Sequence, residues 1–261
     1  MTIDRRRLLG GFAALVAVRT TPAFAIPNDE KIKMTETNLV ELRQYTLVGG
    51  QRDTLVDLFE REFVETQEAA GIQVFGRYID LDDPDRFVWM RGFSDLETRG
   101  RALGDFYGGP AWAAHREAAN ATMIDSDNVL LLRPSGGCTQ VRNDLTITTG
   151  VLRVTIHYLN GVAPERFDAF WTDALRSMLA EAGSRPFRPL ATAAVENNFP
   201  RLPIRADPVF LSFMHFNDEA EEREFTRWWS SRSGWRDGLS PDLLPALMRK
   251  PEVIRLAPVA R

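Results

Sequence analysis

The sequence predicts an α+β fold of two similar halves, each with the order strand, helix, strand, strand, helix, strand. A first observation is a repeated helix: residues 52–71 and 164–183 both place apolar residues at spacings of three and four, and both end at a glycine. A second is a repeated strand, at residues 87–95 and 210–218, which ends in Phe, then Ser or Asn, then Asp. An antiparallel sheet covered on one face by helices accounts for this order of elements.

The offset between the repeats places one insertion in the second half. It is 112 residues at the helices and 123 residues at the later strands. The extra residues therefore lie between the second and third strands, in the Pro- and Asn-rich stretch NNFPRLPIRADP, residues 197–208. We expect two ferredoxin-like (βαββαβ) domains, at residues 39–134 and 150–258, joined by an exposed linker at residues 135–149.

The N-terminus has the features of an export signal. Arg5-Arg6 begins a basic stretch, a short apolar run follows, and Ala23-Phe24-Ala25 forms an A-x-A cleavage site. The arginine pair followed by Leu8-Leu9 resembles the twin-arginine signal, with a Sec signal as the alternative. We expect cleavage after Ala25 and a bacterial protein that is periplasmic or secreted. No membrane anchor is expected after cleavage, because the apolar run is too short to span a bilayer.

Composition argues against several classes of function. The first 25 residues contain four arginines and one aspartate, so the rest of the chain has 28 basic and 35 acidic residues, a net charge of −7. A net-acidic body argues against nucleic acid binding, which needs a basic surface. The three histidines are far apart and no C-x-x-C pair occurs, so we expect no metal site. The one cysteine, Cys138, lies in the linker, where we expect no catalytic role.

Three stretches of the first half resemble a known family. They are ELRQYTL at residues 41–47, FVWMRGFSDLETRGRA at residues 87–102 and DFYGGPAW at residues 105–112. Together they make this half resemble the NIPSNAP family, and the second half resembles a diverged copy. The resemblance implies a dimeric α+β barrel fold, in which two sheets face each other and helices cover their outer faces. The two halves could form this barrel within one chain, as a monomer, or after homodimerisation.

The first strand of each half carries an arginine near its middle. Because side chains alternate along a strand, we expect Leu42 and Leu152 to face the helices and Arg43 and Arg153 to face the barrel. A buried charge at that place must be paired. Two interpretations follow for these arginines: an ion pair that ties the halves together, with Glu41 as the near partner, or an anchor for a carboxylate or phosphate ligand.

Further polar and aromatic residues complete the predicted site. His157 and Tyr45 are the candidate catalytic residues, and an imidazole can act as a base near neutral pH. The other ligand-binding candidates, besides Arg43 and Arg153, are Trp89, Arg91, Tyr107 and Trp112. Packing is the alternative role for the aromatic residues. No cofactor is expected, with haem bound by His157 as an alternative that the likeness to barrel relatives leaves open.

These residues suggest an exported binding protein whose barrel holds a small apolar or carboxylated molecule. The first alternative is a cofactor-independent enzyme resembling the antibiotic-biosynthesis-type monooxygenases. The residues that would orient and polarise its substrate are Arg43, Tyr45, Arg153 and His157. The second alternative is a ligand-free module whose aromatic helices dock a protein partner. Fold analogy does not choose among the three.

Overall fold

The computed structural model describes residues 36–135, 145–176, 179, 185–231 and 244–259. All described residues belong to one compact unit, Thr35–Arg261. The predicted signal peptide and its cleavage site therefore lie outside the described residues, as does Cys138. Within the described part of the chain, no helix has the length and apolar character needed to cross a membrane.

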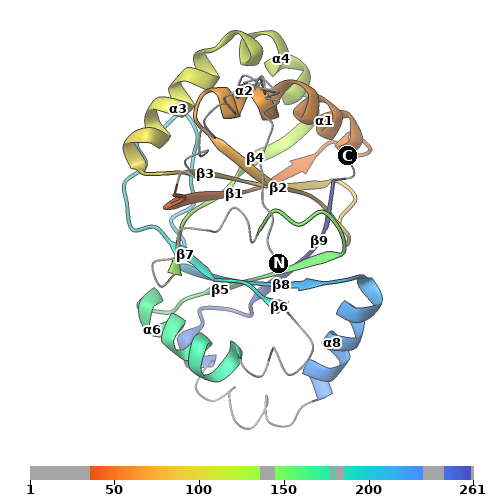
Figure 1. Cartoon of the computed structure of the whole chain (residues 1–261), viewed down its shortest axis with the longest axis vertical. Helices are drawn as coiled ribbons and strands as arrows, with labels where there is room; N and C mark the ends of the chain where they lie inside the picture. Colours follow the sequence, from red (N-terminus) through yellow and green to blue (C-terminus); the bar gives the residue numbers. More distant parts are fainter. Residues whose placement is uncertain (1–35, 136–144, 177–178, 180–184, 232–243, 260–261) are drawn as a thin grey trace, which may run out of the picture. The chain divides into compact units, whose positions relative to one another are not determined.

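The first half forms a four-stranded antiparallel sheet with helices on one face (Figure 1). Its elements are β1 (Leu39–Leu47), α1 (Arg52–Leu58), η1 (Phe59–Phe63), α2 (Val64–Ala69), β2 (Gln73–Asp80), β3 (Arg86–Phe93), α3 (Leu96–Gly108), α4 (Pro110–Ala121) and β4 (Met123–Pro134). The strand order is β2-β3-β1-β4, and β1 lies in the interior of the sheet. Arg43 on β1 lies opposite Trp89 on β3, and Glu41 lies opposite Arg91.

The second half repeats this plan with a weaker second strand. Its elements are β5 (Val151–Tyr158), α6 (Pro164–Phe170), η3 (Trp171–Leu175), β6 (Arg185–Pro186), β7 (Leu190–Thr192), β8 (Val209–Phe216), α8 (Glu219–Ser231), η5 (Leu244–Ala246) and β9 (Glu252–Pro258). β5 pairs with β9 on one side and β8 on the other, and the short strands β6 and β7 both pair with β8. The predicted ferredoxin-like order is confirmed in both halves.

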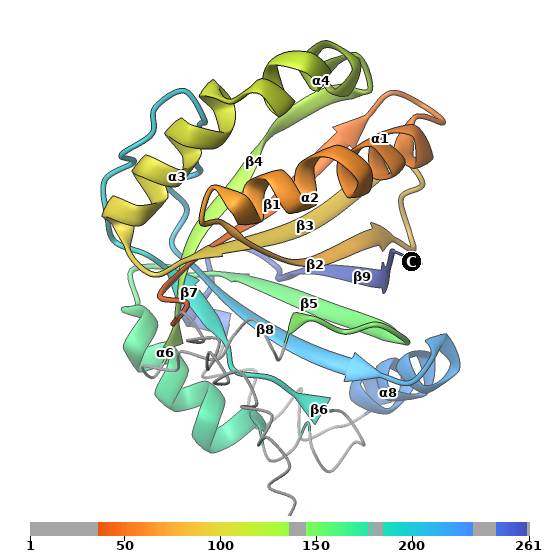
Figure 2. The same cartoon turned by 45° about the horizontal axis from the view of Figure 1, so that its top comes forward.

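The two sheets join into one closed barrel. β2 pairs with β9, β4 pairs with β7, and β5 pairs with β8, so the ends of the nine-stranded sheet meet. Every pairing between these strands is antiparallel. Figure 2 shows the helices α1 to α4 outside one layer of strands and α6 and α8 outside the other. A single chain is therefore sufficient to close the barrel.

The barrel interior is filled by apolar side chains, which corrects the expected orientation of the strands. Leu42, Leu152, Val154 and Ile156 lie in the core between the two sheets, and each is fully buried. Because side chains alternate, Arg43 and the rest of its row face the helices instead. The predominantly apolar row of each strand fills this interior, whereas side chains of the helices can offer polar partners to the other row. The expectation that the polar row faces the barrel was wrong.

The end of the predicted linker also belongs to the core rather than to the exposed surface. Leu145 is buried between the sheets, and Ile147 packs against the same cluster. The Tyr78 hydroxyl, on β2, donates a hydrogen bond to the carbonyl oxygen of Leu145. Burial raises the pKa of Tyr78 above its usual value, so this phenol stays protonated and remains a donor.

Both predicted first helices contain a π-helical turn at the same place. The turns are η1, Phe59–Phe63, and η3, Trp171–Leu175, and they are related by the offset of 112 residues already seen in the sequence. π-Helical turns inside α-helices are rare and often occur at functional sites, because they widen the helix and redirect its side chains. In each half the turn packs over the sheet face that carries the polar row.

Candidate functional site

A small cavity lies between the sheet and the helices of the first half. Its volume is about 110 Å³. Five of the predicted site residues line it: Arg43, Tyr45, Trp89, Tyr107 and Trp112. The π-helical turn η1 supplies two further walls, since the rings of both its terminal phenylalanines border the cavity. The predicted residues thus gather at one place, but on the outer face of the sheet rather than inside the barrel.

Beside this cavity, three arginines surround the carboxylate of Glu41. Arg43 Nη1 lies 2.8 Å from Glu41 Oε2, Arg91 Nε lies 2.8 Å from the same oxygen, and Arg99 Nε lies 2.7 Å from Oε1. All four side chains are at most 2% exposed. The predicted pairing of Arg43 with Glu41 is confirmed, and two more arginines share the same carboxylate.

This arrangement leaves an excess of positive charge in a buried place. Three guanidinium groups and one carboxylate sum to a formal charge of +2. Burial alone would raise the pKa of Glu41, but Arg91, Arg43 and Arg99 outweigh it and hold this pKa well below its usual range. Arg43 Nε also donates a hydrogen bond to the hydroxyl of Tyr45, at 3.0 Å. Burial raises the pKa of Tyr45, so this hydroxyl is a neutral phenol and adds no negative charge.

Two donors at the cavity wall have no hydrogen-bond partner among the described residues. They are Nε2 of Gln67 and Nε1 of Trp89, and both side chains are at most 2% exposed. The other end of the Gln67 amide is fixed, because its Oε1 accepts from Arg91 Nη1 at 3.0 Å. Buried polar groups are nearly always paired, so two such donors at one cavity are suited to an acceptor that enters it.

The insertion of the second half covers this site. The side-chain oxygens of Asn197 and Asn198 accept hydrogen bonds from Arg99 Nη1, at 3.1 and 2.7 Å. The ring of Phe199 stacks on Tyr107, with a centroid separation of 6.0 Å and an interplanar angle of 29°. Leu202, further along the insertion, borders the cavity itself. The extra residues that the sequence offset located therefore complete a site in the other half of the chain.

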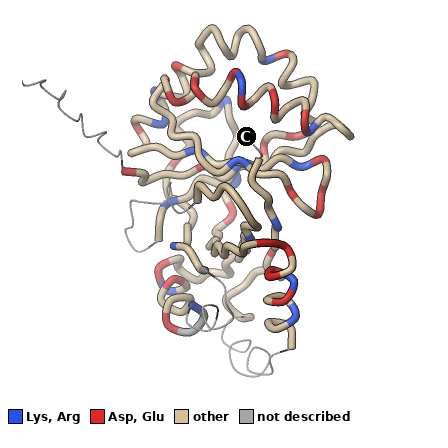
Figure 3. Tube along the Cα trace, turned by 45° about the vertical axis from the view of Figure 1, so that its right-hand side comes forward, with Lys and Arg blue, Asp and Glu red and all other residues tan. Residues whose placement is uncertain are grey.

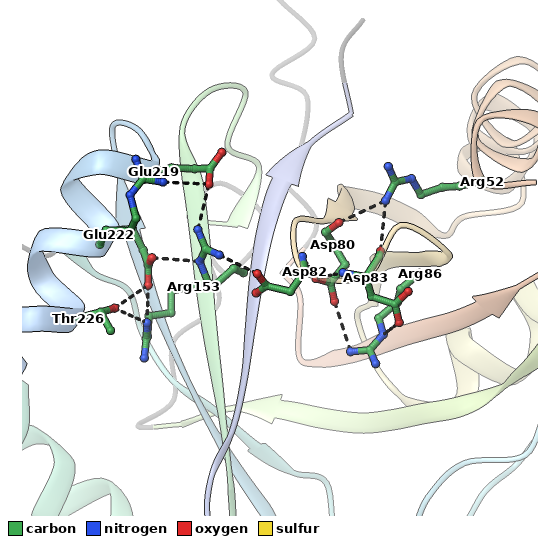
Figure 4. Close-up of polar contacts among 11 residues, drawn as sticks. Arg52, Asp80, Asp82, Asp83, Arg86, Arg153, Glu219, Glu222 and Thr226 are labelled. Atoms are coloured by element: carbon green, nitrogen blue, oxygen red, sulfur yellow. Dashed lines mark hydrogen bonds and ion pairs between the residues drawn. The ribbon is translucent and has the colours of Figure 1, made fainter. Parts of the chain in front are cut away.

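The second half contains a charge cluster at the place that corresponds to Glu41 and Arg99. Here the strand carries the positive charge and the helix carries the negative charge. Arg153 on β5 pairs with Glu222 on α8 and donates to the hydroxyl of Thr226 at 2.9 Å (Figure 4). Glu222 is the counterpart of Arg99, at the offset of 123 residues. In the first half the strand supplies the carboxylate and the helix supplies an arginine; in the second the roles are reversed. Figure 3 shows the acidic residues gathered at the start of α8.

Arg153 and His157 lie in this second half, away from the other predicted residues. Both border a separate, larger cavity. The His157 ring faces the helices, 5.3 Å from the ring of Phe167, and burial lowers its pKa to about 4. Its Nε2 lies 3.4 Å from Ser212 Oγ. The two candidate catalytic residues, His157 and Tyr45, therefore border different cavities, and the geometry gives them no shared reaction centre.

Sequence reasoning missed two central residues, Gln67 and Arg99. A signal for both exists in the helices that carry them. Gln67 follows Phe59 and Phe63 at a spacing of four, and Arg99 stands three residues after Leu96 on the buried face of α3. A polar residue on an apolar helical stripe indicates a buried polar contact. Within the described ranges, no three His, Cys, Asp or Glu side chains are grouped to hold a metal ion.

Comparison with known proteins locates the similarity in the first half and in the overall fold. Residues 40–137 match the model of the NIPSNAP family. A proposed monooxygenase from Lactobacillus acidophilus NCFM is 10% identical, with a TM-score of 0.52, over 85% of this chain and 94% of that chain. One from Fusobacterium nucleatum is 8% identical, with a TM-score of 0.50, over 85% and 93%.

An uncharacterized NIPSNAP-like domain protein from Burkholderia xenovorans is 24% identical, with a TM-score of 0.36, over 39% of this chain and 89% of that chain. None of the curated proteins matches the chain. The two structures matched over 85% of the chain share its α+β barrel fold, and at their low identity they show the fold alone. The matched span 40–137 runs from β1 to the end of β4 and contains Glu41 and its three arginines. Residues 40–137 of this chain therefore resemble the NIPSNAP family, and the chain as a whole shares the α+β barrel fold.

Proposed function

We propose that the cavity of the first half binds a small carboxylate. The observation that carries this proposal is the excess charge of +2 among Glu41 and its three arginines, all of them almost fully buried. An uncompensated buried charge is costly, and an anion in the adjoining cavity would compensate it. Arg43 connects the two, because it pairs with Glu41 and also borders the cavity.

The free donors at the cavity wall support the same class of ligand. The two unpartnered atoms, Trp89 Nε1 and Gln67 Nε2, donate hydrogen bonds and cannot accept them. A carboxylate accepts hydrogen bonds at both oxygens and donates none, so it satisfies donors from several directions. An ammonium group would meet the same donors and the same positive charge with repulsion. The cavity therefore favours an anionic acceptor over a cation.

The volume of the cavity limits the size of the ligand. An apolar cavity of about 150 Å³ holds benzene in another protein. A volume of about 110 Å³ therefore suits a smaller molecule, a carboxylic acid of about two to four carbon atoms. The rings of Phe59, Phe63 and Trp112 form much of the remaining wall and would contact the short alkyl chain.

Calorimetric titration with propionate and with propionamide tests the charge requirement. Propionamide has nearly the same shape without the negative charge. We expect propionate to bind at least about tenfold more tightly, a difference of about 1.4 kcal/mol. Equal affinity of the two compounds, or no binding of propionate, would contradict the proposal.

Matched variants locate the binding site. Arg43→Gln should abolish propionate binding, whereas Arg153→Gln, the same change on the first strand of the second half, should leave it unchanged. If Arg43→Gln does not fold, Trp89→Phe serves instead, because the indole N–H has no partner to lose among the described residues. Trp89→Phe should weaken propionate binding about three- to tenfold, the effect of one hydrogen bond. Unchanged affinity in Trp89→Phe would place the ligand elsewhere.

We also propose that the chain is exported, with cleavage after Ala25. The support is the N-terminal sequence alone: a twin-arginine-like start, an apolar run and an A-x-A site. Intact-mass measurement of protein from the periplasm should give a chain that begins at Ile26. Arg5→Lys with Arg6→Lys should leave the precursor in the cytoplasm if the twin-arginine route is used. Normal export of that variant would indicate the Sec route, and a full-length cytoplasmic chain in the wild type would contradict export.

A further inference from the structure

The second half contains a cavity whose size and chemistry differ from those of the first. Its volume is about 690 Å³, and it lies between the sheet residues Arg153, Thr155 and His157 and the aromatic side chains of Trp171 and Phe225. Trp171 belongs to η3, so this cavity, like the first, borders a π-helical turn. Most of its lining residues are apolar.

The charges that border this cavity are all positive. They are Arg153, Arg249 and Lys250, and no acidic residue is among the described residues that line it. Arg249 and Lys250 are exposed, as are the neighbouring apolar residues Leu244 and Val253, at 59% and 41%. These residues mark the mouth of the cavity, where a charged group on a ligand would remain partly hydrated.

The inner wall is buried and nearly uncharged. Trp171, Met214 and Ser212 are at most 4% exposed, and His157 is 7% exposed. His157 Nδ1 has no hydrogen-bond partner among the described residues, although its Nε2 lies near Ser212 Oγ. An unpartnered ring nitrogen in this mostly apolar wall indicates a hydrogen-bonding atom on the ligand at this depth.

We propose that this cavity binds an elongated organic anion, with its carboxylate at the Arg249–Lys250 mouth, its apolar chain between the aromatic rings, and a hydroxyl or carbonyl oxygen near His157. A cavity of about 150 Å³ holds benzene in another protein. By the same ratio of volume to atoms, a cavity of about 690 Å³ accepts roughly 25 non-hydrogen atoms. Such a ligand is too large for the cavity of the first half. The two sites therefore differ in ligand class, and neither proposal depends on the other.

Titration of the full chain with three probes of equal chain length tests this proposal: dodecanoate, 12-hydroxydodecanoate and dodecyltrimethylammonium, all below their micellar concentrations. Because Trp171 and Trp229 border the cavity, tryptophan fluorescence reports occupancy. We expect dodecanoate to bind at least about tenfold more tightly than the ammonium probe. We expect the added hydroxyl to strengthen binding about threefold or more. Equal affinity for the anionic and cationic probes would overturn the proposal.

Two variants with one control assign the contacts. Lys250→Glu should weaken dodecanoate at least about threefold through charge reversal at the mouth, whereas Arg116→Glu, an exposed change on α4 in the first half, should have no effect. His157→Phe should retain dodecanoate binding and lose the preference for the hydroxylated probe. Excess propionate should not displace dodecanoate. Displacement by propionate, or equal effects of Lys250→Glu and Arg116→Glu, would contradict a separate site at this mouth.

Discussion

Replacing Glu41 by Gln is expected to cause a large loss of stability. The change keeps the shape of the side chain and removes the only carboxylate paired with Arg43, Arg91 and Arg99 in the described structure. Removing one partner from a buried ion pair costs about 3–5 kcal/mol, because the remaining charge stays buried without compensation. For a domain of this size that loss corresponds to a decrease in Tm on the order of 10 °C. Thermal unfolding followed by circular dichroism measures it.

A matched control separates this effect from a general loss of negative charge. Glu65, on α2, is exposed, and Glu65→Gln should change the Tm by less than about 2 °C. If Glu41→Gln were as harmless as Glu65→Gln, the buried arginines would be compensated by another group, and the cavity would not need an anionic ligand. A large decrease in Tm in Glu41→Gln but not in Glu65→Gln would support the role of Glu41 in compensating the buried arginines.

Lowering the pH from 7.5 to 5.0 is expected to destabilise the protein through His157. Burial lowers the pKa of His157 from 6.5 to about 4, so the folded state holds the ring neutral while the unfolded state binds a proton. The contribution of His157 to the free energy of unfolding is complete above about pH 6.5 and is lost as the pH falls toward 4. Between the two measured pH values the loss is about 2 kcal/mol.

Comparison with His157→Phe isolates this contribution from the other titrating groups. The free energy of unfolding is measured in urea at both pH values for each protein. We expect the decrease on acidification to be about 2 kcal/mol smaller in the variant, since a phenyl ring has no proton to bind. The same decrease in both proteins would show that His157 is protonated in the folded state as readily as in the unfolded one.

The arrangement of elements followed from local signals in the sequence. The repeated amphipathic helices and the repeated strand ending in Phe and Asp predicted two βαββαβ halves, and the change in offset located the insertion at residues 197–208. These features depend on neighbouring residues, whose spacing is set by the period of a helix or strand. The pairing of Arg43 with Glu41 was predicted for the same reason, because the two lie on one face of one strand.

The orientation of the strands and the residues that complete the site could be known only from the structure. Both faces of β1 are buried, so alternation separated Leu42 from Arg43 without showing which of them faces the barrel. The structure decides this, because Leu42 lies in the apolar cluster between the two sheets. The contact of Asn198 with Arg99 joins residues that are far apart in the chain. No local pattern in the insertion predicts that it covers the other half.

A crystal structure of the protein soaked with propionate would show whether the cavity of the first half receives a carboxylate. We expect propionate in this cavity, with its carboxylate within hydrogen-bond distance of Trp89 Nε1 or Gln67 Nε2 and beside the guanidinium of Arg43. The methyl end should point toward the rings of η1. Propionate absent from this cavity at saturating concentration, or bound with its carboxylate turned away from all three groups, would contradict the proposal that the buried charge of the first half receives a carboxylate.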